Sequence, residues 1–146
     1  MKIALVAAAA AALAFAAPAA AQEVSYTPGT YWSVAMVDVQ DGKEQDYIDF
    51  LASEYRKSQE FAKSKGYIEG YHVLSNVDRR PGEPDLYLIV EFKKFFDPAE
   101  ELRQQKEYEA FMKRSERQMT AESGARGTMR TLMGSMLWRE LNLKPR

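Results

Sequence analysis

The same junction between a strand and a helix occurs twice in this chain of 146 residues. A run of alternating apolar residues precedes Asp41 and Glu44, and a second such run precedes Asp97 and Glu100. An Asp side chain accepts the free backbone N–H groups of a first helical turn, and a Glu three residues later reaches back to the cap. The sequence therefore predicts two helices, capped by these four residues, that each follow a strand.

The first residues have the pattern of an export signal. Lys2 supplies a positive charge, residues 3–17 are apolar and rich in alanine, and Pro18 precedes small residues that end at Ala21. An apolar run of this length is too short to span a bilayer comfortably. We expect residues 1–21 to be a cleaved signal peptide. The remaining chain would then act in the bacterial periplasm or outside the cell, with no membrane segment.

Composition limits the partners of the remaining chain. Charged residues make up 28% and hydrophobic residues 46% of the sequence, and the net charge is −1 with both signs interspersed. No basic stripe with interleaved aromatic residues occurs, which argues against nucleic acid as a partner. The chain has no cysteine, so neither disulfides nor a lipid-modified cysteine contribute. These features are typical of one ordinary globular domain.

Periodicity and turn residues divide the chain into alternating strands and helices. We expect a flexible lead-in over 22–30 and a single domain over 31–146. Within this domain the expected strands are 31–40, 71–77, 85–92 and 129–141, the expected helices are 43–65 and 98–118, the hairpin loop is 78–84, and the flexible link is 123–127.

This order predicts an α+β fold of the ferredoxin-like β-α-β-β-α-β type, with a four-stranded antiparallel sheet and two helices on one face. In the third strand, Leu86 and Leu88 alternate with Tyr87, Ile89 and Glu91. We assign the even positions to the core that packs on the helices. The opposite face still carries apolar residues, and an open apolar face is a liability in a monomer. The simplest cover is a second copy of the chain, which predicts a homodimer through the open sheet face.

The strand followed by Asp41-Gly42-Lys43-Glu44 and by an aromatic-bearing helix resembles the dimeric α+β barrel superfamily, which includes antibiotic-biosynthesis-type monooxygenases. The resemblance spans about residues 31–141. It implies two ferredoxin-like protomers whose sheets pack into a shared barrel, with a ligand pocket between sheet and helices. It carries over no catalytic residue. Haem-degrading members use a histidine on a helix, and His72 lies in an expected strand, so no haem is predicted.

His72 and Glu91 are the candidates for acid–base chemistry. His72 is the only histidine, and an imidazole titrates near neutral pH. Glu91 shares a strand face with Tyr87, where burial could make its carboxylate a general base. Each residue also has a simpler interpretation. His72 fits a half-exposed strand residue with one hydrogen bond, and Glu91 fits a solvated group or an ion pair with Lys93 or Arg139.

Trp32, Tyr87 and Trp138 are the candidates for ligand binding. Aromatic side chains line pockets for planar ligands, but they more often fill a core or an interface. The methionines lack the spacing of a copper array and no cysteine or second histidine supports them, so we expect gap-filling and no metal site. No cofactor is predicted, and one histidine without cysteine assembles no common hydrolase site.

Three functions remain open at this point. The first is a homodimeric protein that binds a small, apolar or aromatic organic molecule between sheet and helices. The second is a cofactor-independent monooxygenase, in which a dry pocket and one or two polar groups suffice. The third is a structural or interaction domain whose barrel interior is filled by side chains. A cavity that contains His72 or Glu91 would favour the enzyme, and a cavity lined by apolar groups would favour binding.

Overall fold

A computed structural model describes residues 24–145, and the expected signal peptide lies outside these residues. The helices and strands, in chain order, are β1 Tyr26–Val39, α1 Glu44–Phe50, the π-helical turn η1 Leu51–Tyr55, α2 Arg56–Ser64, β2 Gly70–Ser75, β3 Leu86–Phe92, α3 Pro98–Met112, α4 Glu116–Ala125, the 3-10 turn η2 Arg126–Thr128 and β4 Arg130–Leu143.

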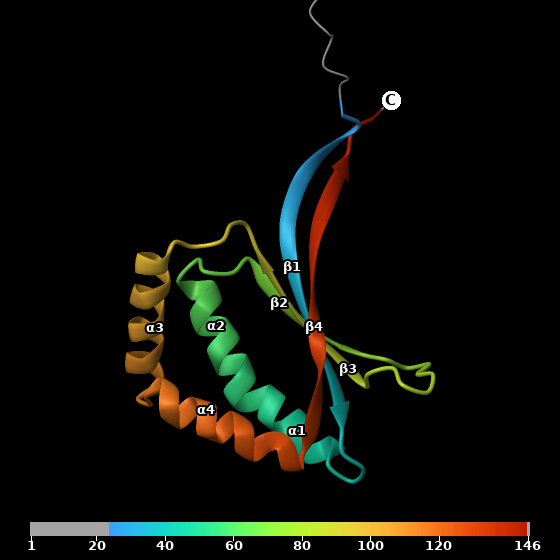
Figure 1. The fold of residues 1–146 in the computed structure, drawn as a ribbon, viewed down its shortest axis with the longest axis vertical. Helices are drawn as coiled ribbons and strands as arrows, with labels where there is room; N and C mark the ends of the chain where they lie inside the picture. The colour runs from blue at the N-terminus through green and yellow to red at the C-terminus, as the bar shows by residue number, and fades with distance from the viewer. Residues whose placement is uncertain (1–23, 146) are drawn as a thin grey trace, which may run out of the picture.

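The four strands form one antiparallel sheet in the order β2-β3-β1-β4. Figure 1 shows the helices on one side of this sheet, with α3 and α4 standing away from the strands. The predicted α+β class and the four-stranded antiparallel sheet are confirmed. The arrangement also fits a ferredoxin-like fold, because the two central strands are the first and the third of the chain.

The core lies between the first helical region and the centre of the sheet. Val37 of β1 and Leu86 of β3 are paired in register, and they pack with Tyr47 and Leu51 from the helices. Each of these side chains is buried, which contributes about 1.5–3 kcal/mol per large apolar side chain. Leu88 packs against the same cluster. The prediction that even positions of β3 face the helices is therefore confirmed for Leu86 and Leu88.

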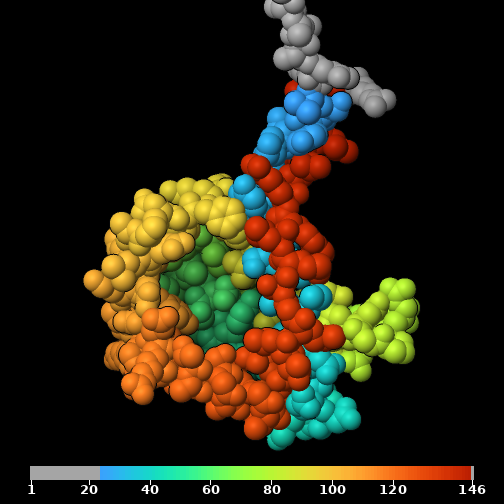
Figure 2. All heavy atoms as spheres, viewed as in Figure 1, coloured from blue at the N-terminus to red at the C-terminus, as the bar shows by residue number. Residues whose placement is uncertain are grey.

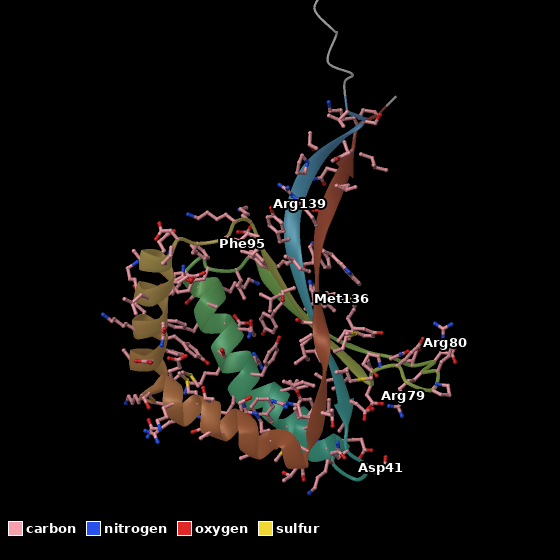
Figure 3. The ribbon with its side chains drawn as sticks, in the orientation of Figure 1. Asp41, Arg79, Arg80, Phe95, Met136 and Arg139 are labelled. Carbon is pink, nitrogen blue, oxygen red and sulfur yellow. The ribbon has the colours of Figure 1, made fainter. Side chains whose placement is uncertain are left out.

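The first helix start differs from its prediction. The N-cap of α1 is Lys43, and no side chain caps this end, so neither Asp41 nor Glu44 acts as expected. Gly42 adopts a φ of 75°, and the Lys43 N–H bonds to the Gln40 carbonyl oxygen at 2.9 Å. Asp41 is part of this tight turn, so it does not stand at the position from which it would cap the helix. Asp41 is exposed in the turn (Figure 3).

The second helix start matches its prediction at the cap. Asp97 Oδ1 accepts the backbone N–H groups of Ala99 and Glu100, each at 2.9 Å, and Pro98 is the first helical residue. The Glu100 side chain does not make the expected return bond among the described contacts. Its carboxylate instead pairs with Lys94 at 3.5 Å. Asp97 therefore caps α3 alone.

The expected helix over 98–118 is two helices. Lys113 has a left-handed φ of 55° and ends α3 at Met112. Ser115 then starts α4 with a full capping box, in which Gln118 returns the bond to the Ser115 N–H at 2.8 Å. The expected flexible link over 123–127 is also wrong, because α4 and η2 cover it. The second cap redirects the chain, and α4 runs at a large angle to α3 (Figure 1).

The expected helix over 43–65 is one continuous helical region that contains the π-helical turn η1. It ends before Gly66, which adopts a φ of 71° as a C-terminal glycine should. A π-helical turn inserts one extra residue in the helix and turns the following side chains, and such turns are frequent at functional sites. Here the π-helical turn lies between Tyr47, which packs in the core, and Ser58, which lies on the following helix α2.

β1 begins at Tyr26, so part of the expected flexible lead-in over 22–30 is strand. Tyr26 and Pro28 pair with Leu143 and Leu141 of β4, whereas the pairing of β1 with β3 ends at Tyr31. The ends of β1 and β4 therefore project beyond the sheet as a two-stranded arm, visible at the top of Figure 1. Turn residues Pro28 and Gly29 misled the prediction, because a bulge accommodates them within the strand.

Candidate ligand-binding cavity

The candidate residues predicted from the sequence gather on the sheet face that points away from the helices. We call this surface the open face. It is formed by one row of side chains from each strand, and the register places its members side by side: Gly70, Glu91, Trp32 and Trp138; then His72, Ile89, Val34 and Met136; then Leu74, Tyr87, Met36 and Gly134.

His72 and Glu91 form a hydrogen-bonded pair on the open face. His72 Nε2 lies 2.6 Å from Glu91 Oε1, although the two residues are diagonal neighbours in the sheet. Gly70 stands opposite Glu91 and has no side chain, so the imidazole can lean across. The side chain of His72 is 50% exposed and that of Glu91 is 20% exposed. The pair is thus partly solvated, and Glu91 does not use Lys93 or Arg139 as its partner.

One aromatic ring contacts this pair, and two more lie on the same face. The Trp32 indole stacks on the His72 imidazole, with ring centroids 6.1 Å apart and planes at 14°. Trp138 is the cross-strand neighbour of Trp32 and remains 51% exposed. Tyr87 lies two rows along the sheet from Trp32, and it is paired with Leu74. The structure therefore brings four of the five predicted candidates together, but on a surface rather than in the space between sheet and helices.

A cavity of the size of a ligand site lies on the other side of the sheet. It has a volume of about 630 Å³ and is bounded by α2, α3, the start of α4 and the segment after β3. Figure 2 shows it within the hollow that α3 and α4 surround, with α2 at its base. Its size is in the range of small-molecule sites. We call it the aromatic cavity, because its walls contain Phe61, Tyr67, Phe92, Phe95, Phe96 and Tyr108.

The rings of the aromatic cavity support one another. Phe61 of α2 contacts both Tyr67 and Tyr108, with ring centroids 6.3 Å and 5.9 Å away. Phe95 stands at the rim, where it packs edge-on against Phe92 at 5.2 Å (Figure 3). Such aromatic pairs add about 0.5–1.5 kcal/mol beyond the area they bury. The cavity is therefore walled by mutually fixed rings.

A charged network holds Tyr67 in this wall. The Tyr67 hydroxyl donates to Glu107 Oε2 at 2.7 Å, and Lys65 Nζ contacts the same oxygen at 2.9 Å. Arg103 Nη1 donates to the other carboxylate oxygen at 2.8 Å. Donated hydrogen bonds from Lys65 and Tyr67 are the largest causes that lower the pKa of Glu107 from 4.5 to about 2. Glu107 is ionised at neutral pH and joins α3 to the end of α2.

A second cavity of about 310 Å³ adjoins the aromatic cavity. The two share wall residues, among them Ser58 and Tyr108. The Tyr108 hydroxyl donates to Ser58 Oγ at 2.8 Å across this border. We call the second space the arginine cavity, because Arg114 and Arg126 line it.

Ionisable groups of the arginine cavity are perturbed by their surroundings. Burial raises the pKa of the Tyr55 phenol to about 12, with smaller contributions from Tyr47 and Tyr71. Burial also lowers the pKa of Arg126, and the nearby charge of Arg130 adds to this effect. The Arg126 guanidinium lies over the Phe50 ring at 4.3 Å. At neutral pH the phenol is therefore a hydrogen-bond donor and the guanidinium is a cation.

None of the predicted candidates Trp32, His72, Tyr87, Glu91 and Trp138 lines either cavity. The family resemblance implied a pocket between sheet and helices but identified none of these wall residues. One available signal was the Phe-Lys-Lys-Phe-Phe run over 92–96, which puts three phenylalanines at the end of an expected strand. Arg126 gave no signal, because its position depends on the unpredicted helix α4.

No group of three or more His, Cys, Asp or Glu residues within 24–145 is placed to hold a metal ion. Within the same residues, no helix is long and apolar enough to cross a membrane.

Comparisons with known proteins do not identify a relative. No protein-family model matches the chain, and neither curated proteins nor solved structures give a match. The functional argument therefore rests on the geometry of the two cavities and of the open face.

Proposed function

We propose that this chain is a ligand-binding protein that takes up a small, largely apolar or aromatic organic molecule between its sheet and its helices. The observation that carries the proposal is the aromatic cavity of about 630 Å³. A space of this size with apolar walls is unfavourable when filled only with water, and a planar apolar molecule would release that water. Phe61 and Tyr108 would contact such a molecule from opposite helices.

The proposal includes a homodimer in which the open faces of two copies meet and form a shared barrel. Trp138, Leu74 and Met136 supply apolar surface on the open face, and Trp138 and Leu74 are about half exposed. β4 is an edge strand, and it pairs only with β1 among the described strands. A second copy matches this surface better than a polar partner does, because its own apolar open face can cover the apolar side chains. The same contact can also protect the unpaired edge of β4.

Simple binding fits the cavity better than catalysis does. A cofactor-independent monooxygenase needs a polar group positioned at its substrate. The hydrogen-bonded pair of His72 and Glu91 is the best acid–base candidate, and it lies on the open face rather than in either cavity. A structural domain with a filled interior is the remaining alternative. The open hollow in Figure 2 favours a ligand over that alternative.

Native mass spectrometry of the purified protein tests the proposal. We expect a co-purified small molecule that is retained at low collision energy and released on unfolding. Ala62 lines the aromatic cavity, so Ala62→Trp should fill it and abolish the added mass. Ala110→Trp is the matched control, because Ala110 is exposed on α3 and lines neither cavity. Equal retention in both variants would contradict binding in the aromatic cavity.

A further inference from the structure

The two adjoining cavities differ in chemistry along their length. The aromatic cavity has six phenyl and phenol rings and no guanidinium group among its described wall residues, whereas the arginine cavity has two guanidinium groups and three carboxylates beside Phe50 and two methionines. Tyr108 and Ser58 mark the border between them. A molecule that spans this border would meet aromatic walls at one end and guanidinium groups among apolar side chains at the other.

Three polar side-chain atoms in these walls are buried without a described hydrogen-bond partner. They are Gln104 Nε2 in the aromatic cavity, and Tyr55 Oη and Arg126 Nε in the arginine cavity. All three carry hydrogen to donate, since Tyr55 stays protonated at neutral pH. Buried donors without partners are rare in folded proteins, and each costs free energy. The three atoms are covered in the free protein, so a ligand that satisfies them must offer acceptor atoms and the side chains must rotate toward it.

The charges at the arginine cavity leave Arg126 without a carboxylate partner. Arg114 is held by two carboxylates, those of Glu54 and Glu122, the latter at 2.6 Å. Arg126 makes no ion pair within residues 24–145, and Arg130, which is 8% exposed, donates to Ser123 Oγ at 3.2 Å instead of to a carboxylate. Buried cations are normally paired. Within residues 24–145 neither of these two guanidinium groups forms an ion pair, and the Glu122 carboxylate, which is bonded to Arg114, acts on Arg126 only as a nearby charge.

Three carboxylates line the arginine cavity and oppose an anion, namely Glu54, Glu116 and Glu122. Arg114 pairs with Glu54 and Glu122, and the third carboxylate is that of Glu116. Glu116 lies at the border of the two cavities, where its carboxylate accepts from Gln105 Nε2 at 2.6 Å. Arg126 lies beyond this border, in the arginine cavity only. An anionic group at Arg126 therefore does not need to share the place of Glu116.

We propose that the ligand is a flat apolar molecule that carries one carboxylate. Its apolar part lies in the aromatic cavity, and its carboxylate lies in the arginine cavity on Arg126, with Tyr55 as a second donor. A guanidinium offers a planar pair of N–H groups that matches a carboxylate. This inference rests on the proposed function and names the ligand class for the same site.

The test compares 1-naphthaleneacetic acid with 1-naphthaleneacetamide, which have the same ring and nearly the same shape. Isothermal titration of the full protein at neutral pH should show that the acid binds about tenfold or more tightly than the amide. Arg126→Gln should remove that preference. Arg126→Lys keeps the charge but loses the Nε donor, and should retain part of it. Arg117→Gln is the control, because Arg117 is exposed on α4, the helix just before Arg126, and lines neither cavity.

Tyr55→Phe separates a binding role from a structural one. Removal of a buried hydroxyl that has no partner should raise the melting temperature of the free protein, whereas affinity for the acid should fall several-fold. Equal affinity for acid and amide would overturn the carboxylate assignment and leave the proposed function intact. If neither compound binds, and Ala62→Trp also changes nothing in the native mass spectrum, both the assignment and the proposed function are wrong.

Discussion

The hydroxyl of Tyr108 donates a 2.8 Å hydrogen bond to Ser58 Oγ, which joins α3 to α2 across the border of the two cavities. The layer formed by α3 and α4 stands away from the sheet, and this bond joins it to the first helical region, as do the contacts of Glu107 and Arg114. The shape of the proposed ligand site therefore depends on a contact between the two helical regions.

Tyr108→Phe tests this tie. The variant should lose about 1 kcal/mol of unfolding free energy, because one net hydrogen bond is removed and Ser58 loses its donor. Urea denaturation measures the change. Tyr26→Phe, in the projecting arm, is the control and should change stability by less than about 0.5 kcal/mol. Equal losses in the two variants would mean that the bond contributes nothing specific.

Substitution of the two Asp residues at the strand–helix junctions should affect stability differently. Asp97→Ala removes the acceptor for two backbone N–H groups of α3 and should cost about 1 kcal/mol. Asp41→Ala should be close to neutral, since Asp41 caps no helix and is exposed. Thermal or urea unfolding of both variants measures the difference. A larger loss for Asp41→Ala would contradict the assignment of the α1 start to Lys43.

Acid stability should depend on Glu107. Its pKa is lowered from 4.5 to about 2 in the folded protein, so the native state binds fewer protons than the unfolded state between these values. The stabilisation is thus present above about pH 4.5 and is lost as pH falls through about 2. Glu107→Gln should be less stable than the parent at neutral pH, and the gap should close towards pH 2. Glu44→Gln, on the exposed first turn of α1, is the control.

The proposed dimer should depend on Trp138. Trp138→Lys places a charge on the open face and should shift the protein to a monomer in sedimentation velocity at micromolar concentration. Val77→Lys is the matched control, because Val77 is 96% exposed and lies in the hairpin after β2. A monomeric parent protein, or a dimer that survives Trp138→Lys, would contradict the open face as the interface.

The sequence predicted the order of strands and helices better than the places where they turn. Asp97 and Pro98 form a local signal, and the structure uses it as expected. The same pattern at Asp41 gave a wrong cap, because Gly42 adopts a left-handed conformation and a tight turn precedes the helix. The break at Lys113 was missed, since a left-handed lysine is not marked by its residue type.

The candidate site was harder to predict, for a physical reason. The residue types chosen from the sequence, His72 and Glu91, do come together, and Glu91 lies on the face opposite the helices, as the alternation of β3 predicts. The cavity residues come from three helices and a connecting segment whose relative positions depend on the unpredicted break between α3 and α4. Local periodicity carries no information on that packing.

The most direct test of the account is a fluorescence titration with N-phenyl-1-naphthylamine, an uncharged probe that brightens in apolar surroundings. The parent protein and Ala110→Trp should both show a saturable, blue-shifted increase at one probe per chain. Ala62→Trp, with an unchanged circular dichroism spectrum, should not, because the indole fills the aromatic cavity. If Ala62→Trp binds the probe as tightly as the parent does, the aromatic cavity is not the ligand site.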